Sequence, residues 1–485
     1  MNYKGIFRVI GHILLIEAAA LIPPLFVSLY DGDTIPAKCF IFTEILLAAF
    51  SGLIWFWTRK ADRKMYGREG FIIVGAAWIV MSVFGALPFF FSGEIPSYGD
   101  ALFESIAGFT TTGASLVMSI DRLSRGMQLW SSLTHWLGGV GILSFTLAIM
   151  RLSNRGQGQS LYLLRAEAPG PSVEKLVPKI KRHASILYGI YLSLTALCFL
   201  LLFLGGVPAF DSLCISFGTA ATSGFSLRLD SMASYSIYAQ NVTTVFLFLF
   251  GVNFNLYFFI VLKKFRSILK DEEFRAYVVI TAASILLIFL NTFKYFESIP
   301  QALQKVSFTV VSIISSSGYS VADFNSWPEF SKSLIMILIF IGACAGSTSG
   351  GITVSRLLIL AKNCYREIRK MLHPRSVMSI RISGNPLSEN ISRNVMIYVL
   401  VYGLIFAVSL LLVSLDNFSM ETNATAVLGC LSNIGIGLGS IGPGGSFSGF
   451  SALSKFVLAA DMLLGRLEFF PLLIMFHYKT WLKGN

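Results

Sequence analysis

The sequence predicts an all-α membrane protein in which two N-terminal transmembrane helices precede four pseudo-symmetric units around one central pore. Three observations predict this fold. Of the 485 residues, 54% are hydrophobic and 13% are charged, and the charged share is about half that of a soluble globular protein. Several apolar runs reach the roughly 20 residues that a helix needs to cross a bilayer. Finally, a short polar tripeptide followed by glycine occurs four times, each time after an apolar stretch of helical length.

The apolar runs predict ten spans along the chain. We place them at residues 9–30, 40–57, 71–91, 129–150, 186–204, 239–262, 276–291, 333–360, 395–413 and 453–476.

The first of these runs also resembles a signal peptide, because Lys4 and Arg8 precede an apolar stretch. Glu17 and Pro23-Pro24 interrupt that stretch, however, and it continues to Tyr30. These features favour a retained helix over a cleaved leader.

The net charge of +12 follows membrane topology and gives no indication of nucleic-acid binding. Of the 38 Lys and Arg residues, 28 fall in alternate connections, which are residues 1–8, 59–70, 151–185, 263–275, 361–394 and 477–485. The positive-inside rule therefore places these connections and both termini in the cytoplasm. A basic inner rim also attracts anionic lipids or an acidic cytosolic partner, although orientation alone accounts for most of the bias.

The sequence gives no positive indication of an enzyme. The six cysteines show no paired spacing, and the five histidines form no metal-binding pattern. No nucleotide-cradling glycine loop occurs either. We therefore expect no organic cofactor in this chain.

The four glycines define an internal repeat. Gly113, Gly224, Gly318 and Gly435 lie 111, 94 and 117 residues apart, and each interval repeats the order span, short apolar segment, polar kink, span. The short segments, 101–109, 210–220, 303–314 and 422–431, cannot cross the bilayer and fit re-entrant pore helices. We expect a helix pair over residues 1–68 and pore units over 69–155, 156–268, 269–372 and 373–485.

The charge map gives the short segments a direction. Each pair of flanking spans has its long basic connection inside, so the short segment enters from outside. Its C-terminal, partially negative end then points toward the bilayer centre, where it favours a dehydrated cation. Glycine next to it takes positive φ without steric cost, so successive carbonyls can face one ion. Rings of carbonyls replace the hydration shell of K⁺, which makes K⁺ the predicted transported ion.

A single glycine of this kind is more often a helix-packing residue or an ordinary turn. Four matching positions after matching half-helices favour a selectivity filter. The predicted filter residues are Thr111, Thr112, Gly113, Thr222, Ser223, Gly224, Ser316, Ser317, Gly318, Asn433, Ile434 and Gly435, with the backbone carbonyls of the eight non-glycine residues as the main K⁺ ligands.

Over nearly its whole length the chain resembles the Trk/Ktr/HKT superfamily of potassium transporters, and within it the bacterial TrkH/TrkG-type membrane subunits. The motifs that carry the resemblance are Phe103-Glu104-Ser105 through Gly113-Ala114, Gly138-Gly139-Val140-Gly141, Ala345-Gly346-Ser347-Thr348-Ser349-Gly350-Gly351, His373-Pro374-Arg375, Asn433-Ile434-Gly435-Ile436-Gly437-Leu438-Gly439 and Gly465-Arg466-Leu467-Glu468. The resemblance implies four units around one pore, a homodimer, and a cytosolic TrkA-type nucleotide-binding ring.

Within this family, glycine in all four filter segments accompanies K⁺, whereas serine in the first accompanies Na⁺ in some plant relatives. Two departures occur in this chain. Ser315-Ser316-Ser317 stands where relatives often carry Thr, and Ile436 stands where TrkH-type subunits commonly have Pro. They leave the potassium preference in place and bear on the selectivity against Na⁺.

A second constellation breaks the run 333–360. Gly342, Gly346, Ser347, Thr348, Ser349, Gly350 and Gly351 form a density of glycine and small polar residues that a stable helix interior does not favour. Irregular backbone at membrane depth needs a cavity to line, and the alternative is a close helix crossing through small residues. The resemblance implies an intramembrane gating loop beneath the filter.

Arg466 lies inside a predicted span, where a guanidinium is costly unless it faces a cavity or a partner. It could hold loop carbonyls between Gly346 and Gly350, or it could pair with Asp461 or Glu468. Residues two apart on a helix do not face each other, so Glu468 is a poor partner. The resemblance favours a gate role. For Glu104, in the first short segment, we expect an anchoring role.

The predicted function is potassium uptake across the inner membrane, by the multi-pass translocating subunit of a Trk-type system. The alternative is a cation-coupled secondary transporter, such as a K⁺/H⁺ or K⁺/Na⁺ symporter or a less selective Na⁺/K⁺ carrier, because broken helices and internal repeats also occur in that class.

Overall fold

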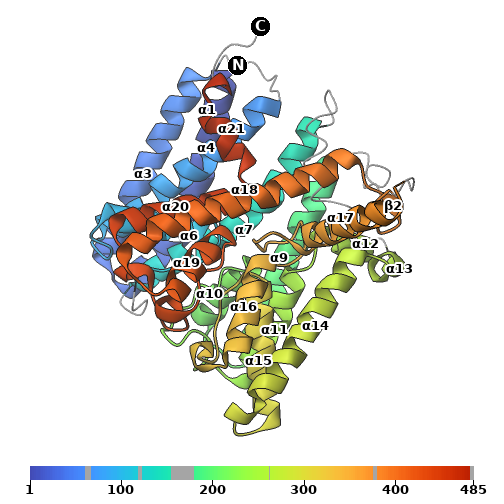
Figure 1. Ribbon diagram of the computed structural model, residues 1–485. Coiled ribbons are helices and arrows are strands. Elements are labelled where there is room, and N and C mark those ends of the chain that lie inside the picture. Colours follow the sequence, from blue (N-terminus) through green and yellow to red (C-terminus); the bar gives the residue numbers. More distant parts are fainter. Residues whose placement is uncertain (60–66, 118–122, 154–179, 262, 375–378, 481–485) are drawn as a thin grey trace.

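The computed structural model describes residues 1–59, 67–117, 123–153, 180–261, 263–374 and 379–480 (Figure 1). Nearly all of its regular secondary structure is helical, and the described strands are β1 (Arg381–Ile382) and β2 (Asn385–Pro386), an antiparallel hairpin. The predicted boundary between residues 155 and 156 lies outside the described residues, as do most of the basic segment 151–185 and parts of 59–70, 361–394 and 477–485.

The N-terminal pair consists of α1 (Tyr3–Ala20), α2 (Ile22–Asp31) and α3 (Thr34–Trp57). The predicted first span is thus divided at Leu21, where the prolines that follow occupy the start of α2 and have no amide hydrogen to continue α1. Together α1 and α2 are still long and apolar enough to cross a membrane. Ser51 in α3 donates a hydrogen bond to the carbonyl of Gly11 in α1 at 2.7 Å, which ties the pair together.

After this pair, the same order of helices occurs four times. Each round begins with a long apolar helix, and all four of these qualify as membrane spans by length and composition. They are α4 with its continuation α5 (Gly67–Gly85, Leu87–Phe91), α9 (Ile180–Leu204), α14 (Glu272–Thr292) and α18 (Glu389–Val413). The protein is therefore a multi-pass membrane protein, as the composition predicts.

The four short helices are α6 (Tyr98–Phe109), α10 (Ala209–Ala220), α15 (Ile299–Ile314) and α19 (Met420–Leu431). All four end at the residues that the sequence predicts, and they begin two to four residues earlier or, in α10, one residue earlier. Serines at the N-caps of α6, α15 and α19 accept hydrogen bonds from the first turn, which explains these earlier starts.

Three of the four second helices are broken. Only α7 (Arg125–Ser153) continues without interruption; the others are α11 and α12 (Ile237–Phe250, Phe254–Val261), α16 and α17 (Glu329–Ile341, Val354–Leu372), and α20 and α21 (Ala452–Arg466, Phe470–Phe476). The break at residues 342–353 agrees with the prediction. The predicted continuous spans 239–262 and 453–476 are wrong: the first bends by 93° between α11 and α12, and Glu468 and Phe469 take positive φ after α20.

Shorter elements complete the fold. They are the helix α13 (Phe265–Leu269) and single 3-10 turns at Phe293–Tyr295, Phe324–Ser326, Ser414–Asp416, Gly439–Ile441, Phe447–Gly449 and Tyr478–Thr480. Figure 1 shows the hairpin, α13 and α17 toward one end of the molecule and α15 toward the other.

The apolar surface agrees with a membrane environment. Large apolar side chains on α18 remain exposed, including Leu400, Leu404 and Leu411, and such a surface in a folded chain indicates contact with lipid or with another protein. The polar residues of the four kinks are instead buried at the centre. Apolar side chains are thus exposed and polar ones buried, the reverse of the pattern in a soluble protein, and the buried polar residues belong to the four kinks.

Candidate ion pathway

Each short helix ends in the same hydrogen-bonded turn. The residue two positions before each of the four glycines takes positive φ. These residues are Thr111, Thr222, Ser316 and Asn433, at 54°, 51°, 61° and 53°. The next amide then bonds to the carbonyl five residues earlier at 2.8 to 2.9 Å, in the pairs Thr112–Ala107, Ser223–Gly218, Ser317–Ser312 and Ile434–Gly429. This is the Schellman motif, and it ends each of the four short helices at the same position relative to its glycine.

These left-handed residues were not predicted. Glycine is the residue expected at positive φ, whereas Thr, Ser and Asn adopt it here although it is uncommon outside glycine. A short polar residue recurs at this position in all four segments, and this recurrence is the feature of the sequence that could have indicated positive φ there. Strained backbone of this kind gathers at functional sites.

The four kinks form a closed ring. A methyl group at Gly113 would overlap the carbonyl oxygen of Ser223, and one at Gly224 would overlap that of Ser317. A methyl group at Gly318 would lie 3.1 Å from the Ile436 side chain, and one at Gly435 would overlap the carbonyl of Gly113. Each segment therefore touches the next in chain order, and the fourth touches the first. We call residues 110–113, 221–224, 315–318 and 432–435 the ring segments.

Gly435 differs from the other three glycines. Gly113, Gly224 and Gly318 take positive φ at 74°, 65° and 85°, as predicted, and Gly435 does not. The expectation of positive φ at Gly435 is therefore wrong. Glycine is required there because the backbone of Gly113 leaves no room for a side chain.

The ring segments leave eight carbonyls free. Among the described residues, no hydrogen bond is donated to the backbone oxygens of Thr111, Thr112, Thr222, Ser223, Ser316, Ser317, Asn433 and Ile434. These residues are nonetheless buried. Buried carbonyls normally have a partner, so a ring of free ones is suited to a dehydrated cation.

Side chains brace the ring from behind. The Asn433 amide donates to Thr112 Oγ1 at 3.0 Å and to the carbonyl of Met462 at 2.9 Å. The hydroxyls of Tyr402 and Ser432 lie 2.9 Å apart. The fourth segment is thus tied both to the first and to the helices around it.

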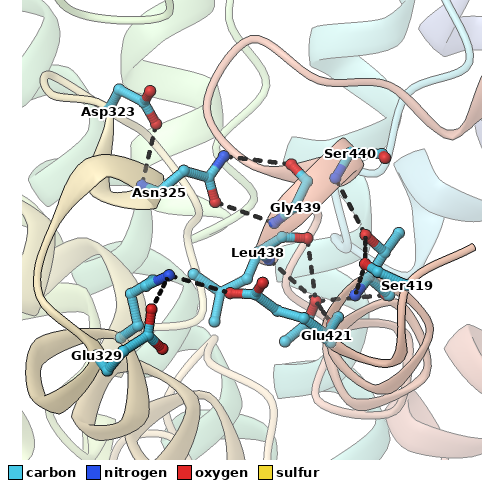
Figure 2. A network of polar contacts seen from close by, with 11 residues as sticks. Asp323, Asn325, Glu329, Ser419, Glu421, Leu438, Gly439 and Ser440 are labelled. Atoms are coloured by element: carbon cyan, nitrogen blue, oxygen red, sulfur yellow. Dashed lines mark hydrogen bonds and ion pairs between the residues drawn. The ribbon is translucent and has the colours of Figure 1, made fainter.

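The chain after the fourth ring segment is held by an asparagine from the third unit (Figure 2). Asn325 donates through Nδ2 to the carbonyl of Gly439 at 3.2 Å and accepts the Gly439 amide at 3.0 Å. Thr425 Oγ1 accepts the Leu438 amide at 3.0 Å. Glu104 acts similarly in the first unit, because it accepts the Leu116 amide at 3.1 Å, which confirms its anchoring role. Nothing in the sequence pattern singled out Asn325.

Residues 342–353, which we call the loop, lie against the ring. Ser349 Oγ and the Gly350 amide reach Ser316 Oγ at 2.5 and 3.0 Å. Thr222 Oγ1 lies 3.4 Å from Thr348 Oγ1, and a methyl group at Gly350 would overlap the carbonyl of Ser432. Three of the predicted loop residues, Thr348, Ser349 and Gly350, therefore contact three of the four ring segments.

Arg466 connects the loop to the remaining unit. Its guanidinium donates to the carbonyl of Thr348 at 2.9 Å and to that of Gly138 at 3.3 Å, and the side chain is buried. Gly138 lies against the carbonyl of Phe109, at the end of the first short helix. The guanidinium therefore bridges the loop and the inner edge of the first unit.

The two carboxylates considered as partners of Arg466 bond elsewhere. Asp461 accepts from Ser409 Oγ at 2.8 Å. Glu468 pairs with Arg356 Nη2 at 2.8 Å, and the Arg356 guanidinium also lies 4.1 Å from the centre of the Tyr398 ring. This pair joins the start of α17 to the break after α20. No pattern in the sequence indicates it, because the two residues lie far apart along the chain.

The arrangement offers no resident metal site of the usual kind. Within the described ranges, no group of three or more His, Cys, Asp or Glu side chains could hold a metal ion. What the arrangement offers an ion is a set of buried backbone oxygens, with a cationic side chain and the loop close by.

Comparisons with known proteins agree with this geometry. The chain matches the TrkH family, described as cation transport proteins, over residues 37–481. It is 35% identical over 495 residues to "Trk system potassium uptake protein TrkH" of Vibrio parahaemolyticus serotype O3:K6, covering 99% of this chain and 100% of the relative. It is 28% identical to "Trk system potassium uptake protein TrkG" of Escherichia coli (strain K12), covering 99% of both. The fold is similar to the crystal structure of the potassium transporter TrkH from Vibrio parahaemolyticus, with a TM-score of 0.89 and 32% identity over 99% of this chain and 100% of that one.

The close contact of the loop with the ring can be tested by Gly350→Ala. Its methyl group would overlap the Ser432 carbonyl, and overpacking of this kind costs about 1–3 kcal/mol. We expect a lower thermal unfolding temperature in detergent. The matched control is Gly403→Ala on the exposed face of α18, where a methyl group meets nothing within 4 Å. Equal unfolding temperatures for the two variants would show that the loop does not press on the ring.

Proposed function

Because the chain belongs to the TrkH family of cation transport proteins, we infer that it takes up potassium across a cell membrane. K⁺ is then the transported substrate, and the four ring segments are its selectivity filter. We assign to this chain the role of translocating subunit in a Trk-type system.

The observation that carries this proposal is the closed ring with its eight free backbone carbonyls. A K⁺ ion entering a dry pore must exchange its water ligands for other oxygens, and inward-facing carbonyls supply them. Four Schellman turns hold these carbonyls at equivalent places. The C-terminal ends of α6, α10, α15 and α19 converge on the same point and add partial negative charge there.

Burial of the ring favours selectivity through preorganisation. The side chains of Asn433 and Tyr402 are engaged by neighbours, and Asn325 holds the backbone just beyond the fourth segment. The segments therefore resist collapse around a smaller ion. The membrane potential drives inward flux and supplies about 2.3 kcal/mol per charge for each 100 mV.

We assign the gate to residues Gly346 to Gly351 together with Arg466. The loop occupies the inner side of the ring, and its small residues let backbone approach backbone. A buried guanidinium on the pathway opposes a passing cation and holds the Thr348 carbonyl in place. Opening then requires that the loop leave Ser316 and that Arg466 exchange its carbonyl partners for water.

The proposed assembly is based on the family resemblance and on the distribution of charge. We propose pore units over residues 69–155, 156–268, 269–372 and 373–485, placed in a homodimer in the inner membrane. Both termini and the basic connections face the cytoplasm, where a TrkA-type nucleotide-binding ring docks beside anionic lipid headgroups. Passive conduction fits four similar units around one ring better than it fits alternating access, which moves one half of a protein against the other.

Potassium uptake can be measured directly. We expect Rb⁺ uptake when the protein is expressed in cells that lack their own potassium systems, and uptake into proteoliposomes when only a membrane potential is imposed. Flux that appears only with a proton or Na⁺ gradient would make the protein a symporter. No uptake despite normal membrane insertion would refute the function itself.

Gly113→Ser tests the filter. The added side chain would overlap the Ser223 carbonyl and is strained at φ 74°, so it widens or distorts the ring. We expect the ratio of Na⁺ to K⁺ flux to rise by about tenfold, equivalent to 1.4 kcal/mol. The matched control is Gly99→Ser at the exposed start of α6, whose nearest neighbouring atom lies 3.7 Å away. An unchanged ratio would remove Gly113 from the filter.

Arg466→Ala tests the gate. Loss of the bonds to Thr348 and Gly138 frees the loop, and the barrier from a buried positive charge disappears. We expect higher Rb⁺ flux in the absence of a regulator, with Arg466→Lys between the variant and the parent. Arg125→Ala, which breaks an exposed pair with Asp31, serves as the control. If flux is the same in all four proteins, Arg466 has only a structural role.

A further inference from the structure

The start of α14 carries three consecutive acidic residues, which bond the loop, the hairpin and α17. These are Asp271, Glu272 and Glu273, and none of them belongs to the ring segments or to the loop. Glu273 is the buried member, with 3% of its surface exposed. A carboxylate at such a position needs strong partners.

The partners of Glu273 are amides at both ends of the loop. Its Oε1 accepts the amide of Ala345 at 2.7 Å and that of Ser355 at 3.2 Å. Ala345 directly precedes Gly346, and Ser355 lies in the first turn of α17. One oxygen therefore closes the base of the loop, and hydrogen bonds to a charged acceptor are stronger than neutral ones.

The other two acidic residues hold the cytoplasmic hairpin and α17. Asp271 Oδ2 accepts from Ser383 Oγ at 3.3 Å, and the Glu272 amide donates to the same hydroxyl at 3.1 Å. The Glu272 carboxylate pairs with Lys362 on α17, and Lys362 also donates to the Arg381 carbonyl at 2.7 Å. Ser383 is the turn residue between β1 and β2.

Apolar packing makes the hairpin part of the same body. Ile382 of β1 is buried in a small cluster with Ile359 of α17 and with Ile391 and Val395 of α18. A displacement of the hairpin therefore acts on α17 and on the start of α14. Glu273 is the next residue along α14, and it bonds the loop directly through the Ala345 amide.

We propose that Glu273 is a positioning residue for the gate: its carboxylate clamps both ends of the loop in the closed arrangement, and Asp271 and Glu272 couple that clamp to the hairpin at residues 381–386. A displacement of the hairpin by a cytoplasmic regulator would then be transmitted to the loop through these contacts. This inference rests on the proposed function, because it takes the loop to be the gate.

Glu273→Ala and Glu273→Gln separate the clamp from a general contribution to folding. Gln retains a carbonyl oxygen that can accept both amides, whereas Ala removes the acceptor. We expect Glu273→Ala to raise Rb⁺ flux without a regulator by about twofold to thirtyfold, the range for loss of a coupling residue. Glu273→Gln stays near the parent, and the K⁺ to Na⁺ ratio is unchanged in both.

The native cysteines provide a readout that a merely structural role would not move. Cys344 lies in the loop and is buried, and Cys198, Cys214 and Cys430 are buried elsewhere, whereas Cys364 is exposed and Cys39 is partly exposed. In Glu273→Ala, a small thiol reagent followed by peptide mass mapping should label Cys344 among the four buried cysteines, while the other three stay protected. Labelling of all four would indicate general destabilisation, and labelling of none would indicate a loop that stays closed. Either result overturns the proposal.

Ser383→Ala tests the link to the hairpin and keeps the proposal falsifiable if Glu273→Ala does not insert. It removes the bonds to Asp271 and to the Glu272 amide, and we expect faster Cys344 labelling and higher flux than in the matched control Ser267→Ala on α13. Identical behaviour of these two variants contradicts the coupling. If Arg466→Ala opens the pathway and Glu273→Ala does not, the clamp fails while the proposed function stands. If the parent takes up no Rb⁺, the function fails first.

Discussion

Backbone polar groups buried in a bilayer have no water to bond, and this constraint governs the whole pathway. The four ring segments and the loop are irregular backbone at membrane depth, and each is stabilised by the others. The Schellman turns use the helix carbonyls behind the ring. Side chains such as Asn325 and Asn433 occupy the remaining donors and acceptors around the fourth segment. The eight carbonyls of the ring segments that accept no hydrogen bond from the described residues remain, and an ion can replace the missing hydrogen bonds there.

The sequence could predict the four short helices because their ends are marked by an abrupt change in chemistry. Apolar residues give way to Thr, Ser or Asn and then to glycine, and all four helix ends were placed at the correct residue. The breaks after α11 and α20 carry a weaker contrast. Gly251 and Asn253 mark the first and Glu468 alone marks the second, and apolar residues stand on both sides of each break. Positive φ at Glu468 and Phe469 is set by tertiary contacts, such as the pair with Arg356.

Side-chain partners distant in the sequence were the other part that could not be predicted. Arg466 meets Thr348 across 118 residues, and Glu273 meets Ala345 across 72. Local pattern identified Arg466 only because a guanidinium is anomalous within an apolar run. Glu273 gave no comparable signal, because acidic residues at a helix start are ordinary. Its burial and its two amide partners become apparent only when α14 is placed beside the loop.

The loop breaks the four-fold likeness of the units, because it comes from the third of them. It lies so close to the ring that Gly350 has no room for a methyl group beside the Ser432 carbonyl. The other units contribute contacts instead: Thr222 from the second, Ser432 from the fourth, and Gly138 of the first through Arg466. The ring is held by turns that every unit repeats. The loop is joined to the ring by hydroxyl contacts and by Arg466, while its base is held by Glu273 and by backbone bonds such as that from the Cys344 amide to the Gly251 carbonyl. Water can replace the bonds to side chains one at a time, and for this reason our proposal places the movement in the loop and not in the ring.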